Sequence, residues 1–399
     1  MKSRTIFSIY LAVIWLFSGI MNCYAQNIST SAEYALITDF DSGLVILDKD
    51  SDMPMKPASM AKIMTIYIAF SRVAEGSLSL EDSFVISEKA WKMGGSRSFL
   101  NAGAQYSLTE LLHGIIIQSG NDAAVALAEG ISGSEENFAN EMNATAARLG
   151  MKNTVFRNAT GWPHPEITTS ARDLNILATS LIRDFPASKY PDLYPIFSET
   201  TYTLNDIKQG NRNPLLYGKN ANRNGADGLK TGYTEESGYG LVASAIRNGQ
   251  RIVMVLNGMS SKAERANESR RLLDFVFREY KKYEFFTAGE TIDEANIWLG
   301  EQAKLPLVLS EPLHRVMSRV DRANTRFQVN WQDPVPAPVT KGQQIGQLQL
   351  IQNDKVIETV PLLAGNTVSE LGFLDRVGEA LKYIILGASN TNVNSPSGS

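Results

Sequence analysis

The sequence predicts an α+β protein: an antiparallel sheet flanked by helices, followed by a small all-β domain and an amphipathic helix. Three observations support this fold class. Strand-like segments lie at both ends of the first 283 residues, mostly helical segments lie between them, and short apolar runs separated by turn residues follow. The chain has 399 residues, of which 43% are hydrophobic and 20% charged, as in a globular protein long enough for two domains.

Residues 1–25 have the pattern of a secretory signal peptide. Lys2 and Arg4 provide positive charge, residues 6–20 form a largely apolar run, and residues 23–25 offer small residues for cleavage. The alternative is an uncleaved membrane anchor, although a run of fifteen residues is short for a full span. A lipid-attachment site at Cys23 is disfavoured, because the two residues before it are not small.

Removal of the signal peptide has consequences for the chemistry available. The mature chain would contain no cysteine, which excludes disulfides, thiol catalysis and cysteine metal sites. It would carry 36 basic residues against 42 acidic ones, a poor balance for binding nucleic acid. Because the three histidines form no close pair, we expect no metal site, and no cofactor is required.

The predicted catalytic domain, residues 26–283, begins and ends with strand pairs. The first pair flanks a Gly-bearing turn at residues 39–43, and the second flanks Asn248-Gly249, a strong hairpin signal. We expect one sheet to join the two ends of this domain. The segments expected to be helical are Ala58–Ala74, Leu108–Glu129, Glu135–Leu149, Ala171–Ile182 and the closing helix Glu264–Tyr283.

Residues 284–367 form the predicted β domain, in which Pro336 and Pro338 exclude a continuous helix. Residues 368–387 have the pattern of an amphipathic helix, with the apolar positions on one face. Residues 388–399 are rich in Asn, Ser and Gly, and we expect them to be disordered.

Three short motifs, each present once, carry the chemistry. They are Ser59-Met60-Ala61-Lys62, Ser119-Gly120-Asn121 and Lys230-Thr231-Gly232, in this order. A Ser-x-x-Lys motif alone is expected by chance in a chain of this length, but all three motifs in this order are not. Together they supply what an enzyme needs to form and resolve a serine ester while it holds a substrate carboxylate.

The first motif predicts a nucleophile and its base. Pro57 favours a helix start, and residues three apart on a helix share one face, so Lys62 can reach the Ser59 hydroxyl. The apolar sequence from Met60 to Phe70 predicts a buried helix, and burial lowers the pKa of a lysine. Free N–H groups at the helix start would also favour an oxyanion. The alternative is a capping serine followed by a surface lysine.

The other two motifs have simple structural alternatives. Ser119 can relay a proton and Asn121 can donate to a peptide carbonyl, although such a sequence is usually a turn with a helix cap. On a predicted edge strand, Lys230 supplies positive charge and Thr231 a hydroxyl donor for a carboxylate. Gly232 would let a substrate backbone approach.

With these motifs the chain resembles the serine D-Ala-D-Ala carboxypeptidases, low-molecular-mass penicillin-binding proteins with a small C-terminal β domain. The resemblance is strong over residues 30–280, and extends over 285–386 in length and general character. It implies a penicillin-binding/β-lactamase-like catalytic domain. The sequences that carry it beyond the motifs are residues 114–123, 170–173, 227–234 and 241–245.

The resemblance implies a role for each site residue. Ser59 would be acylated, Lys62 would be its base, and Ser119 would assist proton transfer. The backbone N–H groups of Ser59 and Tyr233 would form the oxyanion hole, although some family members have His where this chain has Tyr233. The predicted substrate-binding residues are Asn121, Lys230, Thr231, Gly232, Tyr233 and Arg212, of which Arg212 is further from Lys230 in sequence than in the family.

The implied reaction removes the terminal D-Ala from peptidoglycan stem pentapeptides, and β-lactam antibiotics would acylate the same serine. The implied location is the periplasm, peripheral on the outer face of the inner membrane through the helix at 368–387. Because acidic residues outnumber basic ones in that helix, it has no electrostatic attraction to anionic lipid. The alternative is that it packs on the β domain.

Rival functions use the same residues. A transpeptidase or endopeptidase differs only in the acceptor or in the peptide cleaved. A class A β-lactamase needs a deacylating glutamate in a Glu-x-x-Leu-Asn sequence, which is missing between Asn121 and Lys230. A non-catalytic envelope-binding protein is disfavoured by the intact Ser59, Lys62 and Lys230.

Overall fold

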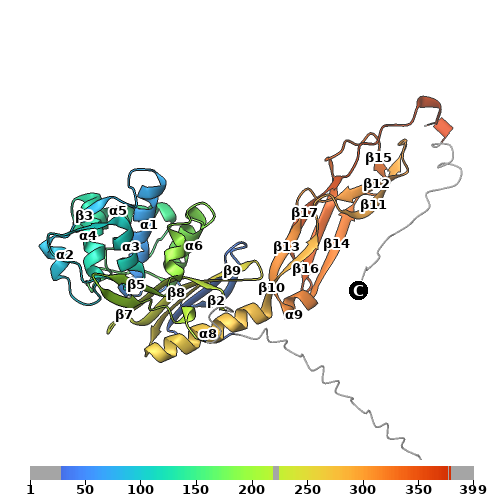
Figure 1. Cartoon of the computed structure of the whole chain (residues 1–399). Helices are drawn as coiled ribbons and strands as arrows, with labels where there is room; N and C mark the ends of the chain where they lie inside the picture. Colours follow the sequence, from blue (N-terminus) through green and yellow to red (C-terminus); the bar gives the residue numbers. More distant parts are fainter. Residues whose placement is uncertain (1–27, 219–223, 376, 379–399) are drawn as a thin grey trace, which may run out of the picture.

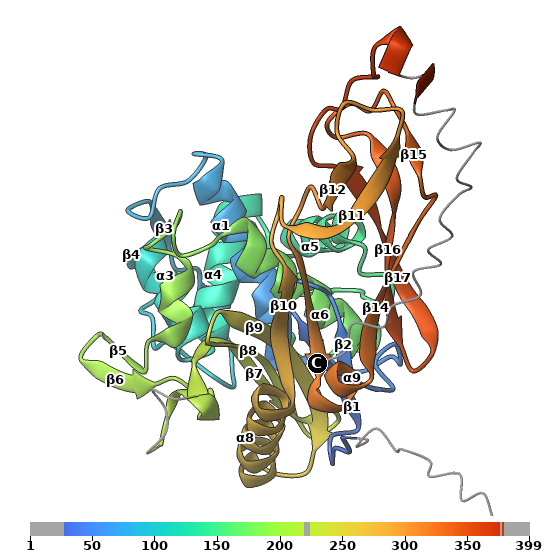
Figure 2. The same cartoon turned by 90° about the vertical axis from the view of Figure 1, so that its right-hand side faces the viewer.

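The computed structural model describes residues 28–218, 224–375 and 377–378 (Figure 1). A body of helices and sheet is followed by an elongated part made mainly of strands (Figures 1 and 2). The predicted signal peptide, residues 379–387 of the predicted amphipathic helix and the C-terminal tail lie outside the described residues.

An antiparallel five-stranded sheet forms the middle of the body, in the order β2-β1-β9-β8-β7. Strands β1 and β9 lie side by side, which confirms that the sheet joins the two ends of this domain. Strand β7 lies at the edge and has one free side. The strands are β1 (Tyr34–Asp39), β2 (Val45–Lys49), β7 (Ala226–Thr234), β8 (Gly238–Arg247) and β9 (Gln250–Met259).

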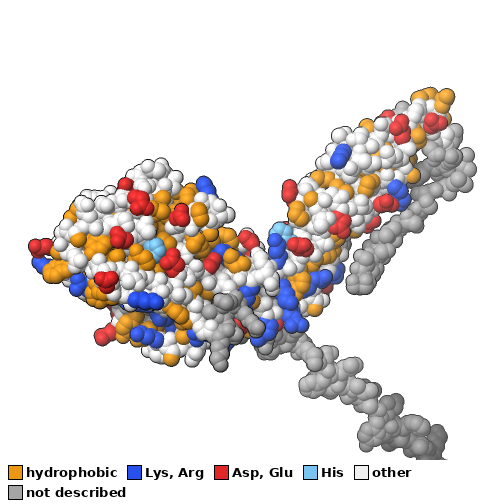
Figure 3. All heavy atoms as spheres, viewed as in Figure 1, with side chains coloured by type: hydrophobic (Ala, Val, Ile, Leu, Met, Phe, Trp, Pro, Cys, Tyr) orange, Lys and Arg blue, Asp and Glu red, His pale blue; other side chains and the backbone are white. Residues whose placement is uncertain are grey.

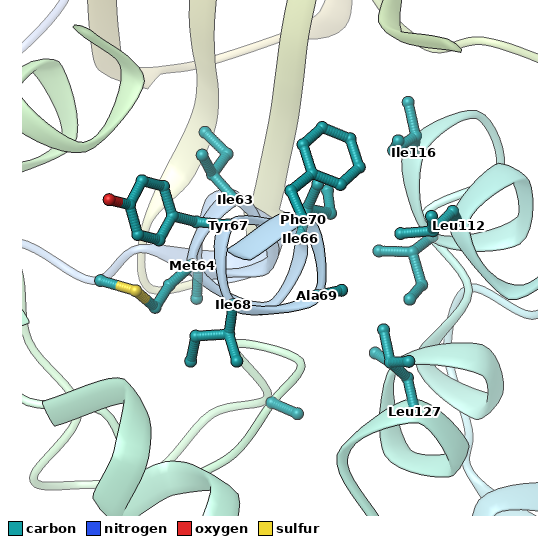
Figure 4. Close-up of a cluster of buried hydrophobic side chains, with 14 of the residues drawn as sticks. Ile63, Met64, Ile66, Tyr67, Ile68, Ala69, Phe70, Leu112, Ile116 and Leu127 are labelled. Atoms are coloured by element: carbon teal, nitrogen blue, oxygen red, sulfur yellow. The ribbon is translucent and has the colours of Figure 1, made fainter. Parts of the chain in front are cut away.

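Helices cover both faces of this sheet (Figure 2). On one face lies the largest core, built around α1 (Lys62–Ala74), which is buried from Lys62 to Phe70. Figure 4 looks along α1, with Leu112 and Ile116 of α3 and Leu127 of α4 on one side. The remaining helices of this layer are α2 (Glu88–Lys92), α3 (Leu108–Ile116), α4 (Asn121–Ser132), α5 (Glu135–Leu149) and α6 (Ala171–Asp184).

The other face is covered by α8 (Lys262–Glu279), whose Leu272, Leu273 and Val276 pack on β8 and β9. The prediction that this helix extends to Tyr283 is wrong, because β10 begins at Tyr280. Short elements complete the body: η1 (Ala58–Ala61), η2 (Tyr194–Ser198), η3 (Pro214–Leu216), β3 (Ser83–Val85), β4 (Gln105–Ser107), β5 (Thr201–Leu204) and β6 (Ile207–Gly210).

The single helix predicted at 108–129 is two helices, α3 and α4, separated by Ile117–Gly120. Ser119 breaks the helix because its φ is +63°, in the left-handed region. Asn121, the last residue of the second motif, is then the first residue of α4. The break places the Ser119 and Asn121 side chains in the interior of the body.

The second part is a β domain with its own core. A six-stranded sheet has the order β14-β16-β17-β12-β11-β15, and β10 pairs separately with β13. The domain also contains one short helix, α9 (Arg319–Ala323). Its strands are β10 (Tyr280–Phe286), β11 (Thr291–Trp298), β12 (Lys304–Val308), β13 (Leu313–Ser318), β14 (Thr325–Trp331), β15 (Val335–Pro336), β16 (Gln344–Gln352) and β17 (Lys355–Ala364).

The helix predicted from residue 368 starts later. Val368 and Glu370 form isolated bridges with Val339 and Gly300, and helical conformation begins at Phe373. Phe373 and Leu374 are 73% and 82% exposed. Among the described residues, no helix combines the length and the hydropathy that crossing a membrane requires.

Candidate active site

Ser59 and Lys62 lie together at the start of α1. Ser59 belongs to the 3₁₀ turn η1, and Lys62 is the first residue of α1. The distance from Lys62 Nζ to Ser59 Oγ is 3.0 Å, as expected for residues one helical turn apart. Lys62 is completely buried, whereas Ser59 remains partly accessible.

Lys62 has two further hydrogen-bond partners, which fix the orientation of its amine. Nζ lies 2.7 Å from Asn121 Oδ1 and 2.8 Å from the carbonyl oxygen of Thr160, and both atoms can only accept. A neutral amine has two N–H groups and one lone pair. If the N–H groups donate to Asn121 and Thr160, the lone pair is left for the proton of the Ser59 hydroxyl.

The surroundings of Lys62 favour that neutral form. Burial, the largest cause, and the positive charge of Arg212 together lower its pKa to about 7, against the opposing effect of the negative charge of Asp122. A substantial fraction of the amine is therefore unprotonated near neutral pH. This is the state that a general base for Ser59 requires.

Asn121 has its amide fixed from both ends. Its Nδ2 donates to the carbonyl oxygen of Gly94 at 2.8 Å, which turns Oδ1 toward Lys62. The second N–H of the amide is available for a substrate carbonyl, the role predicted for it. No sequence motif pointed to Gly94 or Thr160 as part of the site, because each contributes only a backbone carbonyl.

Ser119, two residues before Asn121, has a strained, left-handed backbone conformation. Its side chain is almost completely buried, and its hydroxyl has no hydrogen-bond partner among the described residues. An unsatisfied buried hydroxyl is unfavourable for folding and calls for a functional explanation. Proton transfer, the role predicted for Ser119, is one such explanation.

Lys230 and Thr231 are buried on the edge strand β7. Within the described residues, Lys230 Nζ has one hydrogen bond, to the Thr231 carbonyl oxygen at 3.4 Å, and no ion pair with a carboxylate. Burial lowers its pKa well below the usual value, as do the charges of Lys62, Arg212 and Arg265. The site thus holds a concentration of positive charge that an anionic ligand would neutralise.

Two glycines let the surrounding backbone pack tightly around Ser59. A Cβ on Gly232 would lie 3.0 Å from the Pro57 carbonyl oxygen, so glycine lets β7 pack against the turn that carries the serine. Gly161 has a φ of +74°, and a Cβ there would clash with the Ala58 carbonyl oxygen. We predicted Gly232 for close approach of a substrate, and the structure shows a packing reason for it.

Two arginines, one in a loop and one in α8, add positive charge near Lys62 and Lys230. Arg212 donates to Ser96 Oγ at 2.6 Å, and its positive charge lowers the pKa of both Lys62 and Lys230. Arg265 of α8 was not predicted. It is buried, its Nε has no hydrogen-bond partner among the residues that the structure describes, and its pKa is lowered to about 10, mainly by burial. Its position seven residues before the buried Leu272 was an available sequence signal, because residues seven apart share a helix face.

A cavity of about 320 Å³ opens beside Ser59. Of the predicted site residues, Ser59, Asn121 and Tyr233 line it. The others do not: Lys62, Ser119, Arg212, Lys230, Thr231 and Gly232. Tyr233 is 50% exposed and stacks on Tyr239, with ring centroids 4.2 Å apart. The complete lining is Ser59, Gly95, Ser96, Asn121, Thr160, Gly161, Trp162, Pro163, Tyr233 and Thr234.

Among the described residues, no group of three or more His, Cys, Asp or Glu could hold a metal ion.

The sequence matches the D-alanyl-D-alanine carboxypeptidase family over residues 21–261 and the C-terminal domain of penicillin-binding protein 5 over residues 280–370. It is 34% identical to D-alanyl-D-alanine carboxypeptidase DacF of Bacillus subtilis, over 88% of this chain and 89% of the relative. It is also 34% identical to DacC of Escherichia coli, over 92% of each chain.

Solved structures agree with this assignment. The structure of penicillin-binding protein 5 from Haemophilus influenzae superimposes with a TM-score of 0.69 at 33% identity, and covers 86% of this chain and 99% of its own. DacD from Francisella tularensis gives a TM-score of 0.70 at 30% identity, covering 86% and 95%. The predicted fold class and family are confirmed. This chain, with its Ser59–Lys62 pair and its C-terminal β domain, therefore belongs to the D-alanyl-D-alanine carboxypeptidase family.

Proposed function

We propose that this protein is a serine-type carboxypeptidase that removes the terminal D-Ala from peptidoglycan stem peptides ending in D-Ala-D-Ala. Membership of the family supports the reaction. The observation that carries the serine mechanism is the orientation of Lys62. Its amine is buried, held by two acceptors, and 3.0 Å from Ser59 Oγ.

Acylation begins when the neutral Lys62 amine takes the proton of the Ser59 hydroxyl. Oγ then attacks the carbonyl carbon of the penultimate D-Ala, and the peptide bond to the terminal D-Ala breaks as its nitrogen is protonated. The developing oxyanion accepts hydrogen bonds from the backbone N–H groups of Ser59 and Tyr233. Ser119 passes the proton to the leaving amine, a role that suits a buried hydroxyl with no hydrogen-bond partner in the described part of the chain.

Recognition of the peptide end depends on its carboxylate. Lys230, Arg212 and Arg265 provide positive charge in a largely dehydrated setting, where charge–charge attraction is stronger than in water. Thr231 adds a hydroxyl donor. A peptide whose terminal carboxylate is amidated would lack this attraction and should be a poor substrate.

Water then hydrolyses the serine ester to complete the carboxypeptidase reaction. An endopeptidase would cleave between stem peptides instead, and a D-alanyl-D-alanine endopeptidase of Pseudomonas aeruginosa is 32% identical over 56% of this chain. A transpeptidase would transfer the acyl group to an amine. The relatives that match both domains are named carboxypeptidases, which favours hydrolysis of the terminal bond.

β-Lactams resemble the D-Ala-D-Ala end and should acylate Ser59. Penicillin-binding protein D2 of Listeria monocytogenes, which is 26–27% identical with a TM-score of 0.55, has been solved in ampicillin-bound and cefotaxime-bound forms. In this chain, the short distance between Ser59 and Lys62 and the buried positive charge of Lys230 support covalent β-lactam binding.

Incubation with a pentapeptide ending in D-Ala-D-Ala tests the reaction directly. We expect free D-Ala and no cross-linked dimer, and no release from the matched peptide ending in D-Ala-L-Ala. Dimer as the main product would identify a transpeptidase. Cleavage of a cross-linked dimer without D-Ala release would identify an endopeptidase. A folded protein that binds fluorescent penicillin and releases no D-Ala from the pentapeptide would contradict the carboxypeptidase assignment.

The proposed location is the periplasmic face of the inner membrane, reached through export by the signal peptide at residues 1–25. Exposed hydrophobic side chains at the far tip of the β domain support membrane contact over packing of this segment on the domain (Figure 3). We expect a chain that ends at residue 367 to leave the membrane fraction after export. If it sedimented with membranes as the full chain does, the segment from residue 368 onward would not be the anchor.

A further inference from the structure

Thr65 is a buried polar residue of α1 with no part in the proposed mechanism. It lies three residues after Lys62, so the two side chains share one face of the helix. Its Oγ1 donates to the carbonyl oxygen of Ala159 at 2.7 Å. A hydroxyl inside a helix often bonds to a carbonyl of the same helix, as Ser71 does with Tyr67 at 2.9 Å. The Thr65 hydroxyl instead links α1 to another segment of the chain.

Two successive carbonyls of that segment, which we call the 158–162 loop, accept hydrogen bonds from α1. The Ala159 carbonyl accepts from Thr65, and the Thr160 carbonyl accepts from Lys62 Nζ at 2.8 Å. Ala159 is completely buried, and among the described residues the Thr65 hydroxyl is the one donor to its carbonyl. Loss of that donor would leave a buried carbonyl unsatisfied, which is unfavourable for the present position of the loop.

The side chain of Asn158 explains why both carbonyls face α1. Its Oδ1 accepts from the backbone N–H groups of residues 160–162. In a trans peptide unit, the N–H of one residue points away from the carbonyl of the residue before it. The N–H groups of residues 160 and 161 bond to Asn158, so the carbonyls of Ala159 and Thr160 point to the other side, toward α1.

We propose that Thr65 is a positioning residue for the proposed reaction: its hydroxyl holds the 158–162 loop against α1 and so keeps the Thr160 carbonyl in place as an acceptor for Lys62. Lys62 has only two such acceptors besides Ser59 among the described residues, Asn121 and Thr160. If the Thr160 carbonyl moved away, the amine could rotate and its lone pair would no longer be directed at Ser59. The effect on catalysis rests on the proposed function, whereas the effect on Lys62 itself does not.

Thr65→Val tests this role, because valine keeps the shape of the side chain and removes the hydroxyl. We expect the rate constant for penicillin acylation to fall about tenfold on the alkaline side of the pH profile, because the amine is no longer oriented. A hydrogen bond from an ammonium group to a carbonyl favours the charged form. Its loss should therefore lower the pKa of Lys62 by about half a unit to one unit.

The pKa is measured by carbon NMR of Lys62 Cε in isotope-labelled protein, and the signal is assigned by its loss in Lys62→Met. Thr65→Ser restores the hydroxyl and should keep the wild-type pKa and a rate constant within about twofold of the wild type. Ser71→Ala is the matched control, since it removes a hydroxyl of α1 that bonds within the helix. It should change neither quantity.

A packing role for Thr65 would give a different pattern. A slower Thr65→Val with an unchanged pKa of Lys62, or a Thr65→Ser as slow as Thr65→Val, would overturn the inference, and so would an unchanged rate constant in Thr65→Val. Asn158→Ala releases the 158–162 loop from its other side and leaves α1 intact. It should lower the pKa of Lys62 as well, and an unchanged pKa there would overturn the inference even if Thr65→Val did not fold.

The same measurements separate this inference from the proposed function. If the wild type released no D-Ala and was not acylated by penicillin, the proposed function would be wrong. The NMR comparison would still decide the role of Thr65. A pKa of Lys62 that is equal in the wild type and in Thr65→Val would overturn it, and a lower pKa in the variant would support it.

Discussion

Replacing Ser59 with alanine is expected to lower D-Ala release by at least about 10⁴-fold and to abolish covalent labelling by fluorescent penicillin. The reason is that Oγ is the only atom of the side chain that can form the ester, and Lys62 is oriented toward it at 3.0 Å. Labelling is measured on a denaturing gel after excess reagent, and release is measured by a coupled D-Ala assay.

Two further variants make this result specific. Ser77→Ala removes an exposed serine that follows α1, and it should leave labelling unchanged. Ser119→Ala should slow acylation but still allow labelling, because the nucleophile is intact. Persistent labelling of Ser59→Ala at the wild-type rate would show that another residue is acylated, and the mechanism proposed above would fail.

Replacing Lys62 with methionine is expected to slow acylation by about 10² to 10⁴-fold, the range that a general base contributes. The pH dependence gives a sharper signature. With the pKa of Lys62 at about 7, the base is neutral above that pH and protonated below it. The second-order rate constant for penicillin acylation should therefore rise with pH through about 7, and fall about tenfold per unit below it.

The Lys62→Met variant should lose this fall in the acylation rate constant below pH 7, the acidic limb of the pH profile. Lys152→Met, a change at an exposed lysine, should keep it. The charged groups that act on Lys62 are Arg212, which lowers its pKa, and Asp122, which raises it. Arg212→Gln should thus move the limb to higher pH. An acidic limb that persists in Lys62→Met would assign the titration, and the base, to another group.

The local part of the site could be predicted from the sequence, because helix geometry alone places Ser59 and Lys62 one turn apart. The contacts that orient Lys62 could not. Thr160 contributes a backbone carbonyl from a loop 98 positions away, and backbone groups leave no trace in side-chain patterns. Asn121 was predicted as a substrate ligand, and its bond to Lys62 depends on a long-range approach that the sequence does not encode locally.

The errors at helix boundaries have equally specific causes. The apolar pattern runs through residues 108–129, so periodicity predicts one helix, and only the left-handed backbone of Ser119 divides it. At the other boundary, residues 280–283 could extend α8 or begin a strand. The outcome is decided by β13, whose residues pair with this segment from 32 to 38 positions further along the chain.

The passage from α8 into β10 leaves no residue between the two elements, since one ends at Glu279 and the other begins at Tyr280. A flexible linker would let the β domain rotate relative to the catalytic body. The distance between that body and any attachment point on the β domain would then vary. Here the backbone of the helix that packs on β8 and β9 continues directly into the domain. If the segment from residue 368 onward attaches to a membrane as proposed, the β domain would act as a spacer that sets the distance between that membrane and Ser59.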